Sequence, residues 1–583
     1  MLHTLTRSLR ENKGPALVTV LLSALEVVFE IVIPLFMSNL IDFGIEGGSM
    51  AAVWKFGAFL LLLAAFQLST GVLAARIAAR ASVGFAANLR EDMYNNVQTF
   101  AFSNIDKFST ASIVTRLTTD TTNVQNAFQM LMRMAIRAPV MLIFSMIVSF
   151  RISRDISMTF LIILPILALA LFFIIRSVFP VFTRVFRTYD ELNNVVQENV
   201  RGIRVVKSFN LERHEIGKFG AISERIYKDF SKGERLITLN APLMQFCIYT
   251  CMIVISWLGA KAIIASGNDP ALGLTTGNLT ALITYTMQIL SSLMMLSMVF
   301  AMLTISLSSA RRIAEVLEER SDIPQPEQPV MTVRDGAVDF DHVSFVYASK
   351  ADKKVLDDID LHIRSGETIG IIGGTGASKS SLVQLIPRLY DVTGGKLTLG
   401  GVDVRDYDLD TLRGAVAMVL QKNELFSGTI AENLRWGNEN ATDEQLRHAC
   451  KLACADGFIS AMPDGYDTHI EQGGTNVSGG QKQRLCIARA LLKKPKVLIL
   501  DDSTSAVDTR TDAQIQQALS TYIPDTTKII IAQRISSVQN ADRIVVLDDG
   551  RIDAVGCHDE LLRTCEIYRE VYESQQKGGE DDA

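Results

Sequence analysis

Six stretches in the first 300 residues are apolar for long enough to cross a lipid bilayer. Four of them are uncharged runs of roughly 20 residues or more, at positions 56–75, 156–175, 236–260 and 273–300. Two are weaker: the stretch 15–40 contains Glu26 and Glu30, and the stretch 134–150 is short and includes Arg137. The pattern predicts a membrane domain of six transmembrane helices over residues 15–310.

Basic residues predict the orientation of these helices. They gather in the N-terminal segment 1–14 and in two long stretches near 76–137 and 176–235, so these parts face the cytoplasm, whereas the short connections face outward. Each long stretch fits a helical hairpin with arms of about 25 residues, which would project about 40 Å beyond the bilayer. The chain is therefore expected in the cell membrane as a multi-pass protein.

The pattern changes after residue 310. Residues 311–337 form a linker with three prolines between positions 324 and 329, and short β-branched runs then alternate with helical segments over 338–573. Five runs are predicted strands, at 343–347, 368–372, 497–500, 528–532 and 543–547. They predict an α/β domain with a mainly parallel sheet. The last residues, 574–583, read as a polar, disordered tail.

Composition supports a membrane protein and excludes some partners. Hydrophobic residues make up 48%, charged residues only 21%, and the mean hydropathy is +0.23, which is too apolar for an ordinary soluble enzyme. With 57 Lys+Arg against 63 Asp+Glu, the net charge of -6 leaves no basic excess for nucleic acid. The seven scattered cysteines do not fit a secreted disulfide framework.

A glycine-rich turn between a strand and a helix predicts a phosphate-binding loop. Its backbone N–H groups would wrap the β-phosphate, Lys379 would meet the β and γ oxygens, and Ser380 would hold Mg²⁺. Ser378 departs from the pattern, because glycine is expected just before the lysine. The residues of this loop are Gly373, Gly374, Thr375, Gly376, Ala377, Ser378, Lys379, Ser380 and Ser381.

Two further motifs bear on the same chemistry. A buried strand over 497–500 is followed by Asp501, which would hold Mg²⁺ through water, and Asp502, which would align the attacking water. Residues 476–484 open a helix with a serine and two glycines, which offers free N–H groups to a phosphate.

Together these motifs resemble those of ATP-binding cassette (ABC) exporter half-transporters, in which six membrane helices are fused to a nucleotide-binding domain. The resemblance implies ATP and Mg²⁺ as ligands, adenine stacking by Tyr347, a Q-loop Gln421 that also meets Mg²⁺, and a D-loop at 505–508 with Asp508. It also implies a head-to-tail dimer, because each ATP lies between one chain's phosphate loop and the other chain's signature motif. The signature motif here is Ser478, Gly479, Gly480 and Gln481.

The resemblance further implies that short helices at the tips of the two cytoplasmic arms, near 104–115 and 210–218, carry the coupling. They are expected to rest on the region 421–427.

Three departures from the family fall on one nucleotide face: Ser378, Asp502 in place of a catalytic glutamate, and Gln533 in place of the switch histidine. The shorter Asp502 draws its carboxylate back by about 1.5 Å, and a misplacement of about 1 Å can cost on the order of 100-fold in rate. Glutamine cannot take a proton as histidine does. The pattern resembles the degenerate-site subunit of bacterial heterodimeric multidrug exporters, whose partner would carry the intact glutamate and histidine. A homodimer that tolerates both changes is the alternative.

The substrate is less directly indicated. Met287, Met294 and Met298 suit an adaptable cavity for small hydrophobic compounds, although methionines that face lipid or pack in the core are the plainer interpretation. Glu26 and Glu30 share a helix face and would attract cationic compounds.

The two carboxylates could equally pair with Arg133 or Arg137. Lipid or peptide export is the alternative cargo, and an ATP-gated channel or regulator, or a membrane-anchored ATPase without cargo, is a less favoured interpretation of the same fold.

Overall fold

The computed structural model describes residues 1–269, 273–347, 354–503 and 507–580. These residues form two compact units. A membrane unit contains Met1–Gln98 and Thr110–Glu319, and an α/β unit contains Thr99–Ser109 and Arg320–Ala583.

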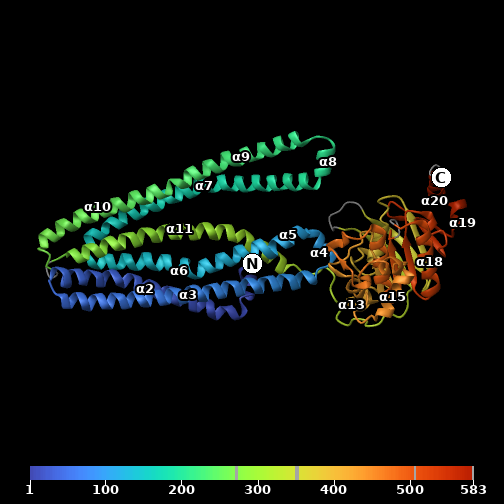
Figure 1. Cartoon of the computed structure of the whole chain (residues 1–583), viewed down its shortest axis with the longest axis horizontal. Helices are drawn as coiled ribbons and strands as arrows, with labels where there is room; N and C mark the ends of the chain where they lie inside the picture. The colour runs from blue at the N-terminus through green and yellow to red at the C-terminus, as the bar shows by residue number, and fades with distance from the viewer. Residues whose placement is uncertain (270–272, 348–353, 504–506, 581–583) are drawn as a thin grey trace. The chain divides into compact units, whose positions relative to one another are not determined.

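The membrane unit confirms the six predicted spans, since the described residues contain six helical segments long and apolar enough to cross a membrane. Their principal helices appear in blue to green in Figure 1. They are α2 (Lys13–Asn39), α3 (Met50–Gln98), α6 (Thr121–Ile152), α7 (Arg154–Arg201), the pair α9 (Glu212–Thr238) and α10 (Asn240–Ser266), and α11 (Thr276–Glu318).

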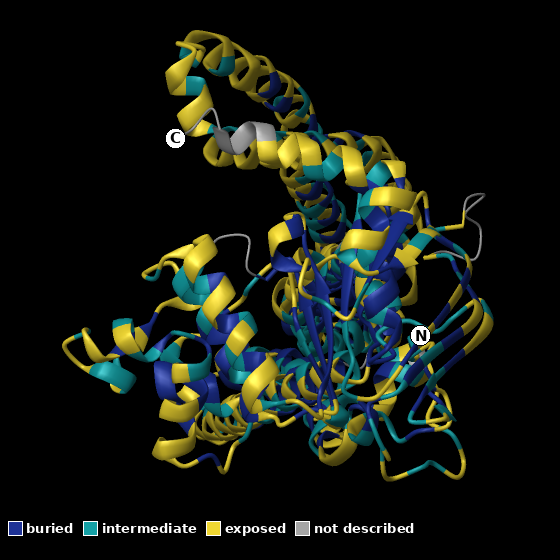
Figure 2. Ribbon diagram, turned by 90° about the vertical axis from the view of Figure 1, so that its right-hand side faces the viewer, coloured by how far each residue is buried: buried dark blue, intermediate teal, exposed yellow. Residues whose placement is uncertain are grey.

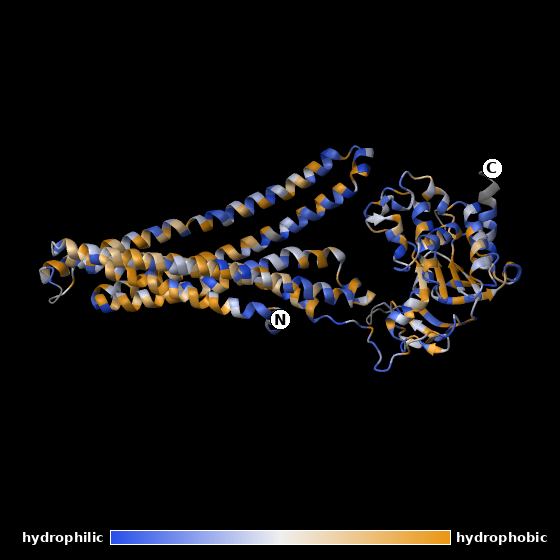
Figure 3. Ribbon diagram, turned by 60° about the horizontal axis from the view of Figure 1, so that its bottom comes forward, coloured by the Kyte–Doolittle hydropathy of each residue, from blue (hydrophilic) through white to orange (hydrophobic). Residues whose placement is uncertain are grey.

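Several of these helices are much longer than a bilayer requires. The 49 residues of α3 span about 74 Å at 1.5 Å per residue, against about 30 Å for the hydrocarbon core. Figure 3 shows hydrophobic residues along the packed part of the bundle and more hydrophilic ones toward the far end of α7 and α9. The excess length forms the two predicted arms.

The second arm corrects one prediction. Its short tip helix is α8 (Ile203–Ser208), whereas the predicted segment 210–218 mostly begins the long helix α9. Gly202, with φ −89° and ψ 11°, lies between α7 and α8, and Asn210, with a left-handed φ of +55°, lies before α9. These two backbone breaks set the tip, and neither follows from the spacing of apolar residues.

The first arm ends in two short helices, α4 (Phe102–Lys107) and α5 (Thr110–Thr115), close to the predicted 104–115. Of these, α4 belongs to the α/β unit.

The α/β unit contains the predicted parallel sheet. Its strand order is β12-β11-β3-β10-β9-β6, and all neighbours are parallel except β11 and β12. The strands are β3 (Thr368–Gly373), β6 (Val416–Val419), β9 (Val497–Asp501), β10 (Thr527–Ile531), β11 (Arg543–Asp548) and β12 (Arg551–Gly556). Figure 2 shows buried residues concentrated on the strands inside this unit.

A second, antiparallel sheet was not predicted. It has the order β2-β1-β4-β5, with β1 (Val338–Phe345), β2 (Leu356–Ile363), β4 (Gly394–Leu399) and β5 (Val402–Asp403). The run at 343–347, grouped with the parallel strands by its composition, belongs mainly to β1. A β-branched run does not reveal which strand it pairs with, so this error is inherent in the pattern.

The helices α12 (Lys379–Leu385), α15 (Asp443–Leu452), α17 (Gly479–Leu492) and α18 (Thr509–Tyr522) complete the parts of the α/β unit that bear on its site. A two-stranded ladder of β7 (Gly428–Thr429) and β8 (His469–Ile470) lies outside the two larger sheets.

The C-terminal helix α20 (Glu566–Glu580) contradicts the predicted disorder of residues 574–580. Tyr568 is fully buried, and Ile567, Val571 and Tyr572 pack against the main core of the unit. These apolar positions recur at helical spacing and anchor the helix, so the polar residues that follow continue it. The prediction missed this because it judged the tail by composition alone.

Candidate functional site

The candidate site lies at one edge of the parallel sheet. The neighbouring strands β3, β10, β9 and β6 all run in the same direction. Their carboxyl ends therefore meet at one edge, which is where ligands of open α/β sheets bind. The phosphate loop follows β3, Gln533 follows β10, Asp501 ends β9 with Asp502 next, and Gln421 follows β6. The fold thus brings together motifs that are far apart along the chain.

The phosphate loop turns from β3 into α12. A Cβ on Gly373 would lie 2.1 Å from the Leu547 carbonyl oxygen, so no other residue fits there, whereas Gly374 and Gly376 have open space around them. Lys379 Nζ donates to the carbonyl oxygens of Gly373 and Gly374, at 2.8 Å each. Burial lowers the pKa of this ammonium, and the nearby Asp501 and Asp502 oppose that shift. The lysine thus lies folded over its own loop.

Ser378 has a left-handed backbone, with φ +68° and ψ 21°, at the N-cap position of α12. Glycine adopts this conformation without cost, whereas an L side chain is strained in it. This is the physical reason why glycine is expected here.

Asp501 and Asp502 face different partners. Ser380 donates its hydroxyl to Asp501 Oδ1 at 3.0 Å, while Gln533 Nε2 donates to Asp502 Oδ2 at 2.8 Å and Gln421 Nε2 approaches the same oxygen at 3.5 Å. Burial raises the pKa of both carboxyl groups, and their hydrogen bonds partly offset the shift. Asp502 also has a left-handed φ of +49°, which aspartate tolerates better than most residues.

The oxygen donors fit a hard divalent cation. Magnesium is bound in proteins by few carboxylate and hydroxyl oxygens together with water and phosphate oxygens. Ser380 Oγ lies 3.0 Å from Asp501 Oδ1, and Gln421 Nε2 lies 3.5 Å from Oδ2 of the adjacent Asp502. The donor set therefore suits Mg²⁺, and the individual roles stay predictions.

Tyr347 lies just after β1 and is 44% exposed. Its hydroxyl is 2.7 Å from Ser381 Oγ on α12, and its ring packs edge-on against Phe345 and Tyr390. An exposed aromatic face held beside the phosphate loop can stack on a nucleotide base.

The helix α4 lies beside this aromatic group. Tyr390 donates its hydroxyl to Asp106 at 2.8 Å and packs against Phe102. Asn104 donates to the carbonyl of Arg320. Within the α/β unit, α4 thus contacts the region of Tyr390, and the contact of the arm tips with 421–427 stays a prediction.

The residues of the predicted signature motif lie at the start of helix α17. Ser478 caps the helix by accepting the N–H of Gln481 at 3.3 Å, and Gln481 Oε1 accepts the N–H of Ser478 at 2.9 Å. This reciprocal capping box leaves the first-turn N–H groups of Gly479 and Gly480 directed outward from the helix start.

The D-loop is only partly described. Ser505 and Ala506 lie outside the described residues, and Asp508 caps α18 by accepting the N–H of Thr511 at 2.9 Å.

The membrane carboxylates are paired. Arg137 donates to Glu26 Oε1 and to Glu30 Oε2, at 2.7 Å each, and Arg133 lies 4.0 Å from Glu26. This is the pairing that the sequence left open. Two carboxylates and two guanidinium groups make a neutral cluster, which a low-dielectric setting favours over unpaired charges. Its contact with a substrate stays a prediction.

Met287, Met294 and Met298 are exposed on α11 at helical spacing, with 40%, 46% and 64% of their surface accessible. They therefore share a face of the helix that the described residues leave exposed.

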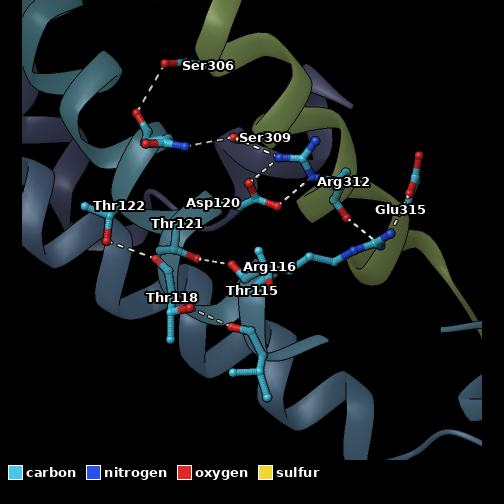
Figure 4. A network of polar contacts seen from close by, with 12 residues as sticks. Thr115, Arg116, Thr118, Asp120, Thr121, Thr122, Ser306, Ser309, Arg312 and Glu315 are labelled. Carbon is cyan, nitrogen blue, oxygen red and sulfur yellow. Dashed lines mark hydrogen bonds and ion pairs between the residues drawn. The ribbon is translucent and has the colours of Figure 1, made fainter. Parts of the chain in front are cut away.

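Sequence reasoning missed a polar network between the first arm and α11 (Figure 4). Asp120 is 1% exposed and accepts two hydrogen bonds from Arg312, one of them 2.7 Å long. Arg116 donates to the Arg312 carbonyl at 2.9 Å and pairs with Glu315 at 3.1 Å. The charged run 311–320 was visible, but its partners lie almost 200 positions earlier.

Comparison with known proteins agrees with this geometry. The family model of the ABC transporter transmembrane region matches residues 16–294, and the family model described as ABC transporter matches residues 356–505. The ABC transporter ATP-binding protein YfiB of Bacillus subtilis is 35% identical over 558 residues, which is 96% of each chain. An ABC transporter ATP-binding protein of Mycobacterium tuberculosis is 33% identical over 580 residues, 99% of this chain and 98% of its own.

A solved structure described as a bacterial Atm1-family ABC exporter with ATP bound has the same fold. The TM-score is 0.79 at 24% identity, and the match covers 97% of this chain and 98% of the other. The two units, the sheet-edge site and these relatives lead to one conclusion: the chain belongs to the ABC transporter family, with a six-helix membrane domain fused to an ATP-binding domain.

Proposed function

We propose that this chain is one half of a heterodimeric exporter that uses ATP to move small hydrophobic or cationic compounds out of the cell. In the dimer it supplies the phosphate loop, strand-end carboxylates and switch residue of a degenerate ATP site. It also supplies Ser478, Gly479, Gly480 and Gln481 to the hydrolytic site of its partner. The partner then carries the catalytic glutamate and switch histidine.

The observation that supports this proposal most is the contact between Asp502 and Gln533. The amide of Gln533 donates to Asp502 Oδ2 at 2.8 Å, and an amide cannot accept a proton from water or pass one on. The pair therefore has a single proton acceptor, the shortened carboxylate of Asp502. Such a site suits nucleotide binding better than turnover.

In this mechanism the phosphates enter the loop at the sheet edge and draw Lys379 away from the carbonyls of Gly373 and Gly374. Ser380, Asp501 and Gln421 would hold Mg²⁺, which would supply positive charge to offset that of the phosphates. Tyr347 stacks on the base. Asp502 orients water poorly because its carboxylate is drawn back and engaged by Gln533, so ATP stays bound across the dimer interface.

The hydrolysis part is tested by restoring the two side chains. The double variant Asp502→Glu, Gln533→His in the assembled transporter should raise ATP turnover at this site by about tenfold or more, because misplaced catalytic groups cost on that order. The matched control is Asp502→Asn, which keeps the size of the side chain and removes its proton acceptor. If the double variant and the control have the same turnover, the degenerate-site proposal fails.

Transport is tested in inverted membrane vesicles with one cationic and one neutral dye. We expect ATP-dependent accumulation of dye that is lost in Lys379→Ala. Accumulation of lipid or peptide without dye would favour the alternative cargo, and ATP-dependent conductance without uphill movement would favour a channel.

A test of the membrane carboxylates must also account for the positive charge of the arginines paired with them. Glu26→Gln with Glu30→Gln removes both negative charges but leaves Arg137 unpaired, which is itself destabilising. The matched variant adds Arg137→Gln, which removes the arginine that bonds to both carboxylates and leaves one positive charge, that of Arg133. A contribution to cation recognition predicts that both variants lose cationic dye transport and keep neutral dye transport. Unchanged cationic transport in the triple variant would remove these residues from the substrate site.

A further inference from the structure

Residues 533–538, called the switch loop below, follow β10 and connect Gln533 to the core of the ATP-binding domain. Gln533 itself is exposed, and its side chain reaches Asp502. The position of that side chain depends on the backbone of a short segment, 533–538, which ends in a single helical turn, η6 (Ile535–Ser537). What fixes this backbone therefore also fixes the distance between Gln533 and Asp502.

One side chain of the C-terminal helix forms two hydrogen bonds with the backbone at the start of this loop. Gln575 Nε2 donates to the carbonyl oxygen of Gln533 at 2.7 Å, and Gln575 Oε1 accepts the N–H of Ile535 at 2.9 Å. A side-chain amide carries one acceptor and two donors. Here it pairs with the loop as a neighbouring strand would, through one N–H and one C=O.

The helix that presents Gln575 is firmly held. Tyr568, two turns earlier on α20, is fully buried and shares a 2.7 Å hydrogen bond with His558 Nδ1. Val571 and Tyr572 pack against the main core. Gln575 is thus the point at which an anchored helix meets the switch loop.

The far end of the same loop has a separate anchor. Ser537 donates its hydroxyl to Asp512 Oδ2 at 2.6 Å, and Asp512 lies in the first turn of α18. The bond to α18 thus holds the end of the loop, and Gln575 on α20 holds its start, where Gln533 lies. The loss of one anchor would leave the other in place, so the loop would loosen locally and the domain would stay folded.

We propose that Gln575 is a positioning residue for the ATP site: it sets the switch-loop backbone and thereby holds Gln533 against Asp502. The C-terminal helix is then part of the nucleotide-sensing machinery. This inference rests on the proposed function only in assigning Gln533 and Asp502 to the γ-phosphate end of the nucleotide.

The test compares Gln575→Ala with Gln576→Ala in the full-length purified protein. Gln576 is the matched control, because it lies next to Gln575 and its side chain donates to Tyr572 of its own helix, at 2.8 Å, with no bond to the switch loop among the described residues. Gln575→Glu is a third variant, since it keeps an acceptor for Ile535 and loses the donor to Gln533.

Hydrogen exchange is read over residues 533–538 without nucleotide. Gln575→Ala should speed the exchange of the Ile535 amide by about fivefold, the effect expected for losing one typical hydrogen bond, while Gln576→Ala should not. Gln575→Glu should give an intermediate value. Unchanged exchange in Gln575→Ala, or an equal effect in Gln576→Ala, would overturn the proposal.

Nucleotide binding is then measured with a non-hydrolysable ATP analogue and with ADP. We expect Gln575→Ala to weaken binding of the ATP analogue by about three- to fivefold and to leave ADP binding unchanged, because only the γ-phosphate end depends on Gln533. Equal weakening of both nucleotides would mean general damage and would contradict a positioning role. Neither readout requires hydrolysis or transport, so a failure of the proposed function would be seen separately.

Discussion

Replacing Ser378 by glycine should stabilise the ATP-binding domain. Ser378 has a left-handed backbone, with φ +68°, which costs an L residue about 1–2 kcal/mol. Glycine relieves that strain, but it also makes the unfolded chain more flexible, which lowers the free energy of unfolding by about 0.5–1 kcal/mol. The net gain is about 0.5–1 kcal/mol, which corresponds to a rise of about 1–4 °C in the melting temperature of a domain of roughly this size.

The assay is thermal unfolding of the full-length protein, read from the transition of the ATP-binding domain. Ser378→Ala is the matched control, because alanine keeps the Cβ and therefore the strain. It should change the transition by less than about 0.5 kcal/mol.

The same reasoning predicts that Ser378→Gly has only a small effect on ATP affinity. The left-handed turn is present without nucleotide, so its strain is common to the free and bound states and cancels in the binding equilibrium. Ser378→Gly should therefore change ATP affinity by less than about twofold. A melting temperature that falls in Ser378→Gly, or rises equally in Ser378→Ala, would refute the strain argument.

Three further predictions concern other contacts. Tyr390→Phe removes the hydrogen bond to Asp106 and keeps the ring, so hydrogen exchange over α4 should quicken by about fivefold; unchanged exchange would show that the bond does not hold the helix. Arg312→Ala leaves the buried carboxylate of Asp120 without its main partner, which should destabilise the membrane domain by about 2 kcal/mol because Arg312 is itself partly exposed. Adding Asp120→Asn should recover part of that loss, and thermal unfolding that shows no recovery would contradict the pairing. Burial raises the pKa of Asp501, and only an ionised carboxylate would bind the Mg²⁺ that we propose for this site. As the pH falls, protons should therefore begin to compete with Mg²⁺ at a higher pH than for an exposed aspartate, in a titration of Mg²⁺-dependent ATP binding; a titration like that of an exposed aspartate would refute this.

The parts predicted correctly from sequence depend on local or periodic signals. The six spans follow from long apolar runs, and the phosphate loop follows from glycines placed between a strand and a helix. Because parallel strands end at one edge, the predicted strands before Lys379 and Asp501 are enough to expect these two residues in one site, whereas Gln421 was expected there only from the resemblance to the ABC family.

The parts that were missed depend on contacts between distant positions. Arg312 finds Asp120 and Gln575 finds the switch loop only because tertiary packing brings their elements together. The antiparallel sheet and the tip at α8 were missed for related reasons, since strand partners and single backbone breaks such as Asn210 leave little trace in hydrophobic periodicity. The sequence suggested that Glu26 and Glu30 could pair with Arg137, but it could not decide between this and the other options.

The central claim is that this chain's own ATP site binds ATP without turning it over well. The most direct measurement is Mg-ATP hydrolysis by the chain purified alone, beside the same chain coexpressed with a partner half-transporter that has the glutamate and histidine. The account predicts little turnover alone and clear turnover together, lost when the partner's glutamate becomes glutamine. Brisk turnover by the chain alone would show that Asp502 and Gln533 suffice, and would contradict the degenerate-site account.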